Sequence, residues 1–292
     1  MDSKDLIFGI STSLCGVDCY LDRLSELKND GITQIEICLR EDIKETEKLF
    51  DDAVEKINYA GLKVRSIHLP FGNSVDPSAE NETDRLKNLK KINEFINLTK
   101  SCGARVFVIH GSYEPVALDE TRKNRIDACV SSMRSLCKTL NGFGIKLAVE
   151  NLPRTCIGNS ISEIAYITDR LPDLGVCFDT NHMTMPKPDL RFVPLQRTFS
   201  RLRNKLNPVV DTPESFAEKF AGKICALHIS DYDGINERHW LPGQGIVNFK
   251  SIHQTLLRNG FDAPFMFEPN EKCRSKKTTG KLLIDGYSNS IK

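Results

Sequence analysis

The sequence lacks long hydrophobic runs, and it lacks an excess of charge of either sign. Its apolar stretches fall far below the roughly 18 residues of a membrane-spanning helix, so we expect no membrane partner. The 40 Lys and Arg side chains nearly balance the 39 Asp and Glu side chains, which leaves a formal net charge of +1. Such a balance creates no general field for nucleic acid or anionic lipid, and it argues against a nucleic-acid partner.

The cysteines are also too sparse for a disulfide-stabilised scaffold. There are 10 in 292 residues, and no two have the Cys-x-x-Cys spacing. Several lie within apolar runs, where a reduced cysteine packs as a small core residue. The first residues lack the basic region and the length of a secretory signal. Together these features predict a cytoplasmic protein.

Eight short apolar runs alternate with helical segments along the chain. They are residues 6–12, 32–39, 62–70, 104–111, 145–152, 174–182, 223–230 and 263–269. This alternation is typical of parallel strands joined by crossover helices. Eight units of about 36 residues each favour a closed barrel over an open sheet. No linker rich in Pro, Gly or Ser interrupts the pattern, so we predict an α/β fold with a single (β/α)8 TIM-barrel domain over residues 1–292.

One connection is predicted to be much longer than the others. Residues 183–211 follow the sixth run and exceed the usual loop of about 2–6 residues. Within them, residues 187–205 carry six basic side chains and one acidic side chain. A lid, a phosphate clamp and a nucleic-acid contact are the functional interpretations of this excursion. A solvated loop and a contact within a homo-oligomer are the alternatives.

Alternation within the runs places titratable side chains inside the predicted barrel. In residues 145–152, Leu147 and Val149 share one face, whereas Glu150 lies on the other. A barrel strand directs one face toward the helices and the other toward the interior, so Glu150 should point inward. The same parity gives an inward set from seven strands, namely Glu36, His68, His110, Glu150, Asp179, His228 and Glu268.

This inward set predicts a metal centre. Burying such groups without partners is costly, so seven of them on one rim are hard to explain as packing. The C-terminal rim is where barrel enzymes hold their active sites. Carboxylates and imidazoles without cysteine suit one divalent metal, with Zn or Mn favoured over Mg or Co. By contrast, His253 falls within a helical pattern and is interpreted as structural.

Seven ordered segments carry a family resemblance, namely SIHLPFG, FVIHGSY, LAVENLP, GVCFDTNHM, ALHISDYDG, RHWLPGQG and MFEPN. They resemble the xylose-isomerase-like TIM-barrel superfamily, which includes sugar and sugar-phosphate isomerases and epimerases, inosose isomerases and dehydratases, and endonuclease IV. The resemblance implies a metal bound by a four-residue set, namely Glu150, Asp179, His228 and Glu268. It also implies that Glu150 and Glu268 act as the catalytic acid and base.

Other rim residues are candidate ligands of substrate or of further metal ions. Residues expected to bind substrate are Glu36, His68, His110, His182, Arg238, His239 and Trp240. Rim packing is the alternative for Trp240, and a supporting contact behind the site is the alternative for Glu36. The resemblance to endonuclease IV implies additional metal ligands at His68, His110, His182, Glu237 and His239, although its residue at the position of Glu237 is Asp.

Two departures bear on the function. Asn151, Leu152 and Pro153 follow the fifth strand as in the isomerases rather than as in endonuclease IV. Cys156 stands where epimerases of free ketohexoses carry a substrate-binding Glu, which weakens an assignment as a ketohexose epimerase.

The sequence therefore predicts a metal-dependent isomerase or epimerase of a sugar or sugar phosphate, working by proton transfer through a metal-stabilised enediolate. The alternatives are an endonuclease IV-like phosphodiesterase on abasic DNA, an inosose-type dehydratase, and a sugar-binding barrel without catalysis.

Overall fold

The structure is a computed structural model that describes residues 6–16, 19–183, 211–234, 236–270 and 278–292. Parallel strands pair in chain order, and β1 closes the barrel by pairing with β8. The strands are β1 (Phe8–Ser13), β2 (Ile32–Cys38), β3 (Lys63–His68), β4 (Val106–His110), β5 (Lys146–Glu150), β6 (Gly175–Asp179), β7 (Ile224–Ile229) and β8 (Phe265–Phe267). Each strand coincides with one predicted apolar run, so the predicted (β/α)8 barrel is confirmed.

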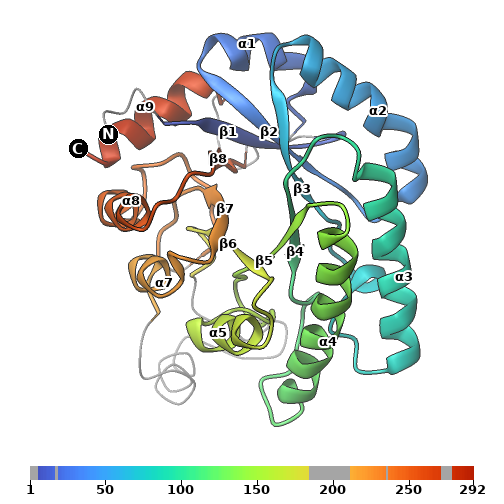
Figure 1. Cartoon of the computed structure of the whole chain (residues 1–292). Coiled ribbons are helices and arrows are strands. Elements are labelled where there is room, and N and C mark those ends of the chain that lie inside the picture. The colour runs from blue at the N-terminus through green and yellow to red at the C-terminus, as the bar shows by residue number, and fades with distance from the viewer. Residues whose placement is uncertain (1–5, 17–18, 184–210, 235, 271–277) are drawn as a thin grey trace, which may run out of the picture.

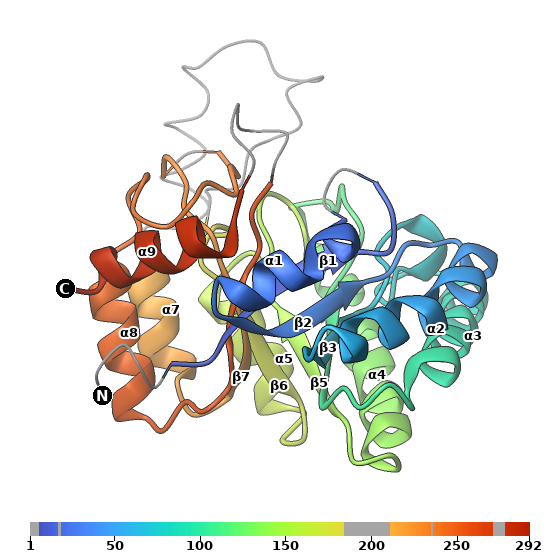
Figure 2. The same ribbon diagram turned by 90° about the horizontal axis from the view of Figure 1, so that it is seen from above.

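Helices cover the outside of the barrel (Figure 1). They are α1 (Leu24–Asn29), α2 (Ile43–Tyr59), α3 (Glu82–Thr99), α4 (Arg122–Asn141), α5 (Ile161–Asp169), α7 (Pro213–Phe220), α8 (Phe249–Arg258) and α9 (Gly280–Ser290), with 3-10 turns at Leu21–Arg23 and Asn73–Val75. Figure 2 shows α2, α3 and α4 along one flank and α7, α8 and α9 along the opposite flank. The sequence did not predict α9. The basic segment 187–205 lies outside the described residues, so its role stays a prediction.

Local sequence signals determine where several helices begin and end. The Asp42 side chain caps α2 by accepting hydrogen bonds from the backbone N–H groups of residues 44 and 45. Thr212 and Ser215 form a reciprocal capping box at the start of α7. Gly61 follows α2 with a φ of +72°, a conformation that glycine adopts without steric cost. These signals fix where α2 and α7 begin and where α2 ends.

Two separate apolar groups occupy the two faces of the sheet. Outward side chains such as Leu147 and Phe178 belong to the large core beneath the helices. The inward group is small, and it consists of Val106, Val108, Ala148, Cys177 and Ala226 with Cys225 packed against it. This division follows the predicted parity. The inward apolar residues precede the polar ones along their strands, so the polar side chains lie at the C-terminal ends.

Within the described residues, no helix combines the length and the apolar character needed to cross a bilayer.

Candidate metal centre and active site

Glu150, the last residue of β5, lies at the centre of the polar rim and is 1% exposed. Its Oε2 is 3.0 Å from His68 Nε2 and 3.2 Å from His110 Nε2. Its Oε1 is 3.2 Å from Nδ1 of both His182 and His228. Burial alone would raise the pKa of Glu150, but the surrounding imidazoles hold this pKa well below its usual value. Glu150 is therefore an anionic carboxylate shared by four histidines.

The four predicted ligands of one metal lie together. Glu150, Asp179, His228 and Glu268 each offer one ligand atom, and these atoms lie within 4.8 Å of one another. Among the described residues, Asp179 Oδ2 and Glu268 Oε2 are buried without a hydrogen-bond donor. Buried carboxylate oxygens without donors are energetically costly, and a divalent cation between them would satisfy both. The donor set and these two oxygens fit a metal site.

The position of Asp179 is fixed from the neighbouring strand. Asn151 Oδ1 accepts a 2.8 Å hydrogen bond from the Asp179 N–H, and Asn151 Nδ2 donates a 2.9 Å hydrogen bond to the Asp179 carbonyl. Asp179 Oδ1 in turn accepts a hydrogen bond from the Asn181 N–H at 2.6 Å. Glu150, which ends β5, is therefore one candidate ligand, and Asn151, the next residue, supports another.

Glu268 has the electrostatic character of a proton-transfer group. Burial, with the neighbouring carboxylates of Asp179 and Glu150, raises the pKa of Glu268 to about 7 and outweighs the opposing effect of His228. A carboxyl group with a pKa near neutrality is suited to general acid–base work, and a bound divalent ion would lower this pKa because its charge favours the carboxylate.

The predicted additional ligands also gather into clusters. One consists of His68, His110 and Glu150, and the other of His182, Glu237 and His239. His239 Nε2 is 3.2 Å from Glu237 Oε1. His239 has a φ of +48°, which is strained for a residue with a side chain. Asn181 Oδ1 supports this loop by accepting hydrogen bonds from the N–H groups of residues 238 and 239, at 3.0 and 3.2 Å.

Arg154 belongs to the site but was not predicted from the sequence. Its backbone has a φ of +58°, and its guanidinium bridges Glu237 and Glu114. The Nε atom of Arg154 is 2.9 Å from each Glu114 carboxylate oxygen. No motif pointed to Arg154, because its partners lie on loops about 40 and 83 positions away in the chain.

A chamber of about 470 Å³ adjoins Glu268 and His239, a volume within the usual range for small-molecule sites. Phe71 is 49% exposed and stacks on His110, with ring centroids 4.5 Å apart. Further residues line this chamber that the sequence did not predict, namely Ser11, Thr12 and Ser13 at the end of β1 and Arg40, Glu41, Phe71 and Asn270 in loops. The loop residues come from irregular segments, where no periodic pattern indicates the direction of a side chain.

Arg238 and Trp240 are held by contacts within their own loop. Arg238 Nε is 2.8 Å from Asp233 Oδ2, and its guanidinium lies 5.7 Å from the Trp240 ring centroid. The backbone of Trp240 pairs with Asp231. Neither residue lines the chamber beside Glu268, so their substrate contacts stay predictions. Glu36 lies deeper in the barrel and is 1% exposed.

Fold and site together define a (β/α)8 barrel with a candidate metal centre of carboxylates and imidazoles at its C-terminal rim. The family model for the xylose isomerase-like TIM barrel matches residues 24–283, and the chain belongs to this family. The resemblance inferred from the seven segments is therefore confirmed.

Individual relatives are distant in sequence. The chain is 24% identical over 225 residues to an uncharacterized protein of Methanocaldococcus jannaschii, covering 74% of this chain and 68% of that protein. It is 24% identical over 277 residues to L-ribulose-5-phosphate 3-epimerase UlaE of Escherichia coli O157:H7, covering 92% of this chain and 88% of that protein. A solved D-tagatose 3-epimerase-like protein has a TM-score of 0.73 at 19% identity, covering 98% of each chain.

Proposed function

We propose that this protein is a divalent-metal-dependent isomerase or epimerase of a sugar or sugar phosphate. One observation carries the proposal, namely that Glu150 and Glu268 belong to one ligand cluster although their strands are three apart around the barrel. Two carboxylates approaching one centre from different strands are suited to act on different sides of one substrate carbon. The epimerase names of distant relatives support the same class of reaction.

The proposed chemistry is a proton transfer next to a carbonyl group. When bound, a divalent ion would hold two neighbouring substrate oxygens and offset the negative charge that develops as the carbon loses its proton. One of Glu150 and Glu268 removes this proton, and the other returns a proton to the opposite face or to the neighbouring carbon. His68 on β3 and His110 on β4 contact one oxygen of Glu150 and hold this side chain in place. Asp179 lies on β6, on the other side of β5. The chamber beside Glu268 would hold the rest of the sugar.

The substrate class and the cellular location are part of the proposal. Cys156 replaces the Glu expected for a free ketohexose, which supports a different or phosphorylated sugar. The nine cysteines in the described residues are unpaired, which supports the predicted cytoplasmic location.

The metal content and the proton exchange test this proposal together. Protein purified without chelator or metal-affinity tag is analysed by plasma mass spectrometry and then assayed with sugars and sugar phosphates in deuterated buffer. We expect about one divalent ion per chain and deuterium incorporation next to the carbonyl. Asp179→Asn should lose the ion, whereas Asp169→Asn, at the exposed end of α5, should keep it. Metal-loaded protein that exchanges no proton across the panel would refute the proposal.

A second candidate is a phosphodiesterase that acts on abasic DNA. The observation in its favour is that the clusters of His68, His110 and Glu150 and of His182, Glu237 and His239 are both assembled. This function requires two or three bound zinc ions and cleavage of an abasic duplex. The net charge of +1 weighs against it, because phosphate-backbone binding relies on basic surface.

A further inference from the structure

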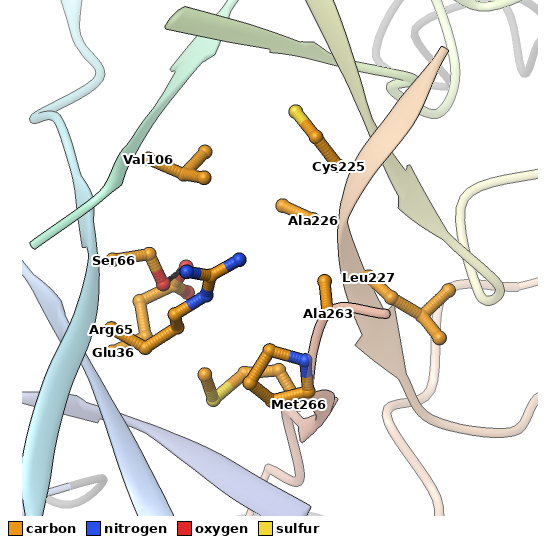
Figure 3. A pocket seen from close by; sticks show the side chains of 10 residues that line it. Glu36, Arg65, Ser66, Val106, Cys225, Ala226, Leu227, Ala263 and Met266 are labelled. Carbon is orange, nitrogen blue, oxygen red and sulfur yellow. Dashed lines mark hydrogen bonds between the residues drawn. The ribbon is translucent and has the colours of Figure 1, made fainter. Parts of the chain in front are cut away.

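Glu36 is a buried carboxylate that the proposed proton transfer does not use. It lies on β2, and Figure 3 shows its side chain beside that of Ser66 from β3. Glu36 Oε2 accepts a 2.7 Å hydrogen bond from Ser66 Oγ. The cavity beside both side chains is about 10 Å³, which is about enough for one water molecule and far too small for a sugar. Glu36 therefore acts on the protein and not on a substrate in this cavity.

The other oxygen of Glu36 faces a candidate metal ligand. Glu36 Oε1 lies 2.9 Å from His228 Nε2, and His228 is fully buried. The opposite ring nitrogen, Nδ1, faces the ligand cluster, at 3.2 Å from Glu150 Oε1, 3.5 Å from Glu268 Oε2 and 3.8 Å from Asp179 Oδ2. One edge of the imidazole thus faces Glu36, and the other faces the cluster.

This arrangement determines which nitrogen of a metal-binding, neutral His228 would carry the proton. A neutral imidazole has one protonated nitrogen and one nitrogen with a lone pair. A lone pair on Nε2 would face the carboxylate oxygen of Glu36 at 2.9 Å, which is repulsive, whereas a proton there is attracted. Nδ1 also faces carboxylates, and it lies 3.2 Å from Glu150 Oε1 in hydrogen-bond geometry. An ion shared by these carboxylates would take the Nδ1 lone pair, so the one remaining ring proton would then belong on Nε2.

Two neighbours of His228 Nε2 compete for its proton. The contact with Glu36 is short but lies outside hydrogen-bond geometry, whereas Cys177 Sγ lies 3.7 Å from the same nitrogen and within that geometry. A thiol is a weak acceptor, and a carboxylate is a strong one. Glu36 is therefore the stronger partner, and Ser66 offsets part of the cost of burying its charge.

We propose that Glu36 is a positioning residue that holds His228 in the tautomer whose Nδ1 binds the metal. The proposal rests on the metal centre of the proposed function but not on the identity of the substrate. Carboxylates behind metal-binding histidines orient the ring and increase its basicity. Their loss typically lowers metal affinity about 10- to 100-fold.

Metal binding by substituted proteins tests this role without an activity assay. We expect Glu36→Leu, which removes the acceptor, to bind Zn²⁺ about 10- to 100-fold more weakly in competition with a chromophoric chelator. Glu36→Gln keeps an acceptor oxygen and should retain most of the affinity. Cys177→Ala removes only the weaker neighbour of Nε2 and should bind Zn²⁺ like the wild type. Ser66→Ala removes the donor that supports Glu36 and should weaken Zn²⁺ binding less than Glu36→Leu does.

A spectroscopic measurement on the wild type covers the case in which Glu36→Leu fails to fold. Protein labelled with ¹⁵N-histidine and loaded with ¹¹³Cd²⁺ should show cadmium coupling to Nδ1 of His228 and a proton on Nε2. Coupling to Nε2 would overturn the proposal, as would wild-type affinity in folded Glu36→Leu.

The outcomes also separate this inference from the proposed function. Weaker metal binding in Glu36→Leu without sugar turnover by the wild type would support the inference and refute the function. Wild-type metal affinity in Glu36→Leu, together with sugar turnover by the wild type, would refute the inference and support the function. Wild-type protein that binds no divalent metal at this cluster would overturn both.

Discussion

Glu268→Gln is the substitution that most directly tests the proposed acid–base pair. It removes the charge and the proton-accepting oxygen while nearly preserving the shape of the side chain. Within the described part of the chain, Glu268 Oε2 has no hydrogen-bond donor, so the fold should lose little stability. A positioned general acid or base contributes about 10²- to 10⁴-fold in rate. We therefore expect substrate proton exchange to slow by this factor, which corresponds to about 3–5 kcal/mol of activation free energy.

The assay must separate proton transfer from metal binding, because Glu268 is also a predicted ligand. Deuterium incorporation is measured by NMR after the metal content of the variant has been restored to the wild-type level. Glu41→Gln is the matched control, since Glu41 lines the same chamber but belongs to none of the three clusters. Exchange at the wild-type rate in metal-loaded Glu268→Gln would refute the assignment. If Glu41→Gln slowed the exchange equally, the cause would be the loss of negative charge in the chamber and not the loss of a proton-transfer group.

Three further predictions concern the frame around the site. Asn151→Ala should cost about 1–3 kcal/mol in urea unfolding and weaken metal binding, because the buried backbone groups of Asp179 lose their partners; unchanged stability would contradict this role. Phe178→Ala should lower the free energy of unfolding by about 3–5 kcal/mol, since this fully buried ring stacks on Phe216 with ring centroids 4.9 Å apart. A smaller decrease would mean that the helices move inward and fill the space left by the ring. Burial lowers the pKa of His253, so its contribution to stability is complete above about pH 6.5 and is lost as the pH falls through the lower folded value. Thermal melts between about pH 7.5 and pH 5 should therefore show a smaller decrease in Tm for His253→Gln than for the wild type, and equal decreases would contradict the prediction.

The barrel and its inward polar residues were predictable because both depend on local patterns. Strand alternation has a period of two, so a single apolar face assigns every other side chain to the interior. Glu150, Asp179 and His228 each end or nearly end a strand, which places them at the rim. The same rule placed Glu36 inside the barrel but did not indicate its depth. Glu36 precedes the end of β2 by two residues and is in register with Ser66, about 7 Å below the level of His68.

The parts of the site that escaped prediction are formed by loops and by distant contacts. Arg154 and Phe71 reach the rim from irregular segments, where no periodicity indicates the direction of a side chain. The α9 helix was missed for a different reason. Gly286 interrupts its pattern, and glycine within a helix costs about 1 kcal/mol relative to alanine. Packing overrides this local cost, since Leu283 and Tyr287 of α9 are both buried in the core.

The position of Glu150 couples the candidate metal sites thermodynamically. It belongs both to the cluster with His68 and His110 and to the cluster with Asp179, His228 and Glu268. An ion in either cluster withdraws electron density from the same carboxylate and changes the charge that the other ion would meet. By linkage, whatever change in affinity the first ion causes for the second, the second causes equally for the first. Metal titrations of this barrel should therefore deviate from independent binding whenever both clusters are filled, and Glu150→Gln should weaken both sites together.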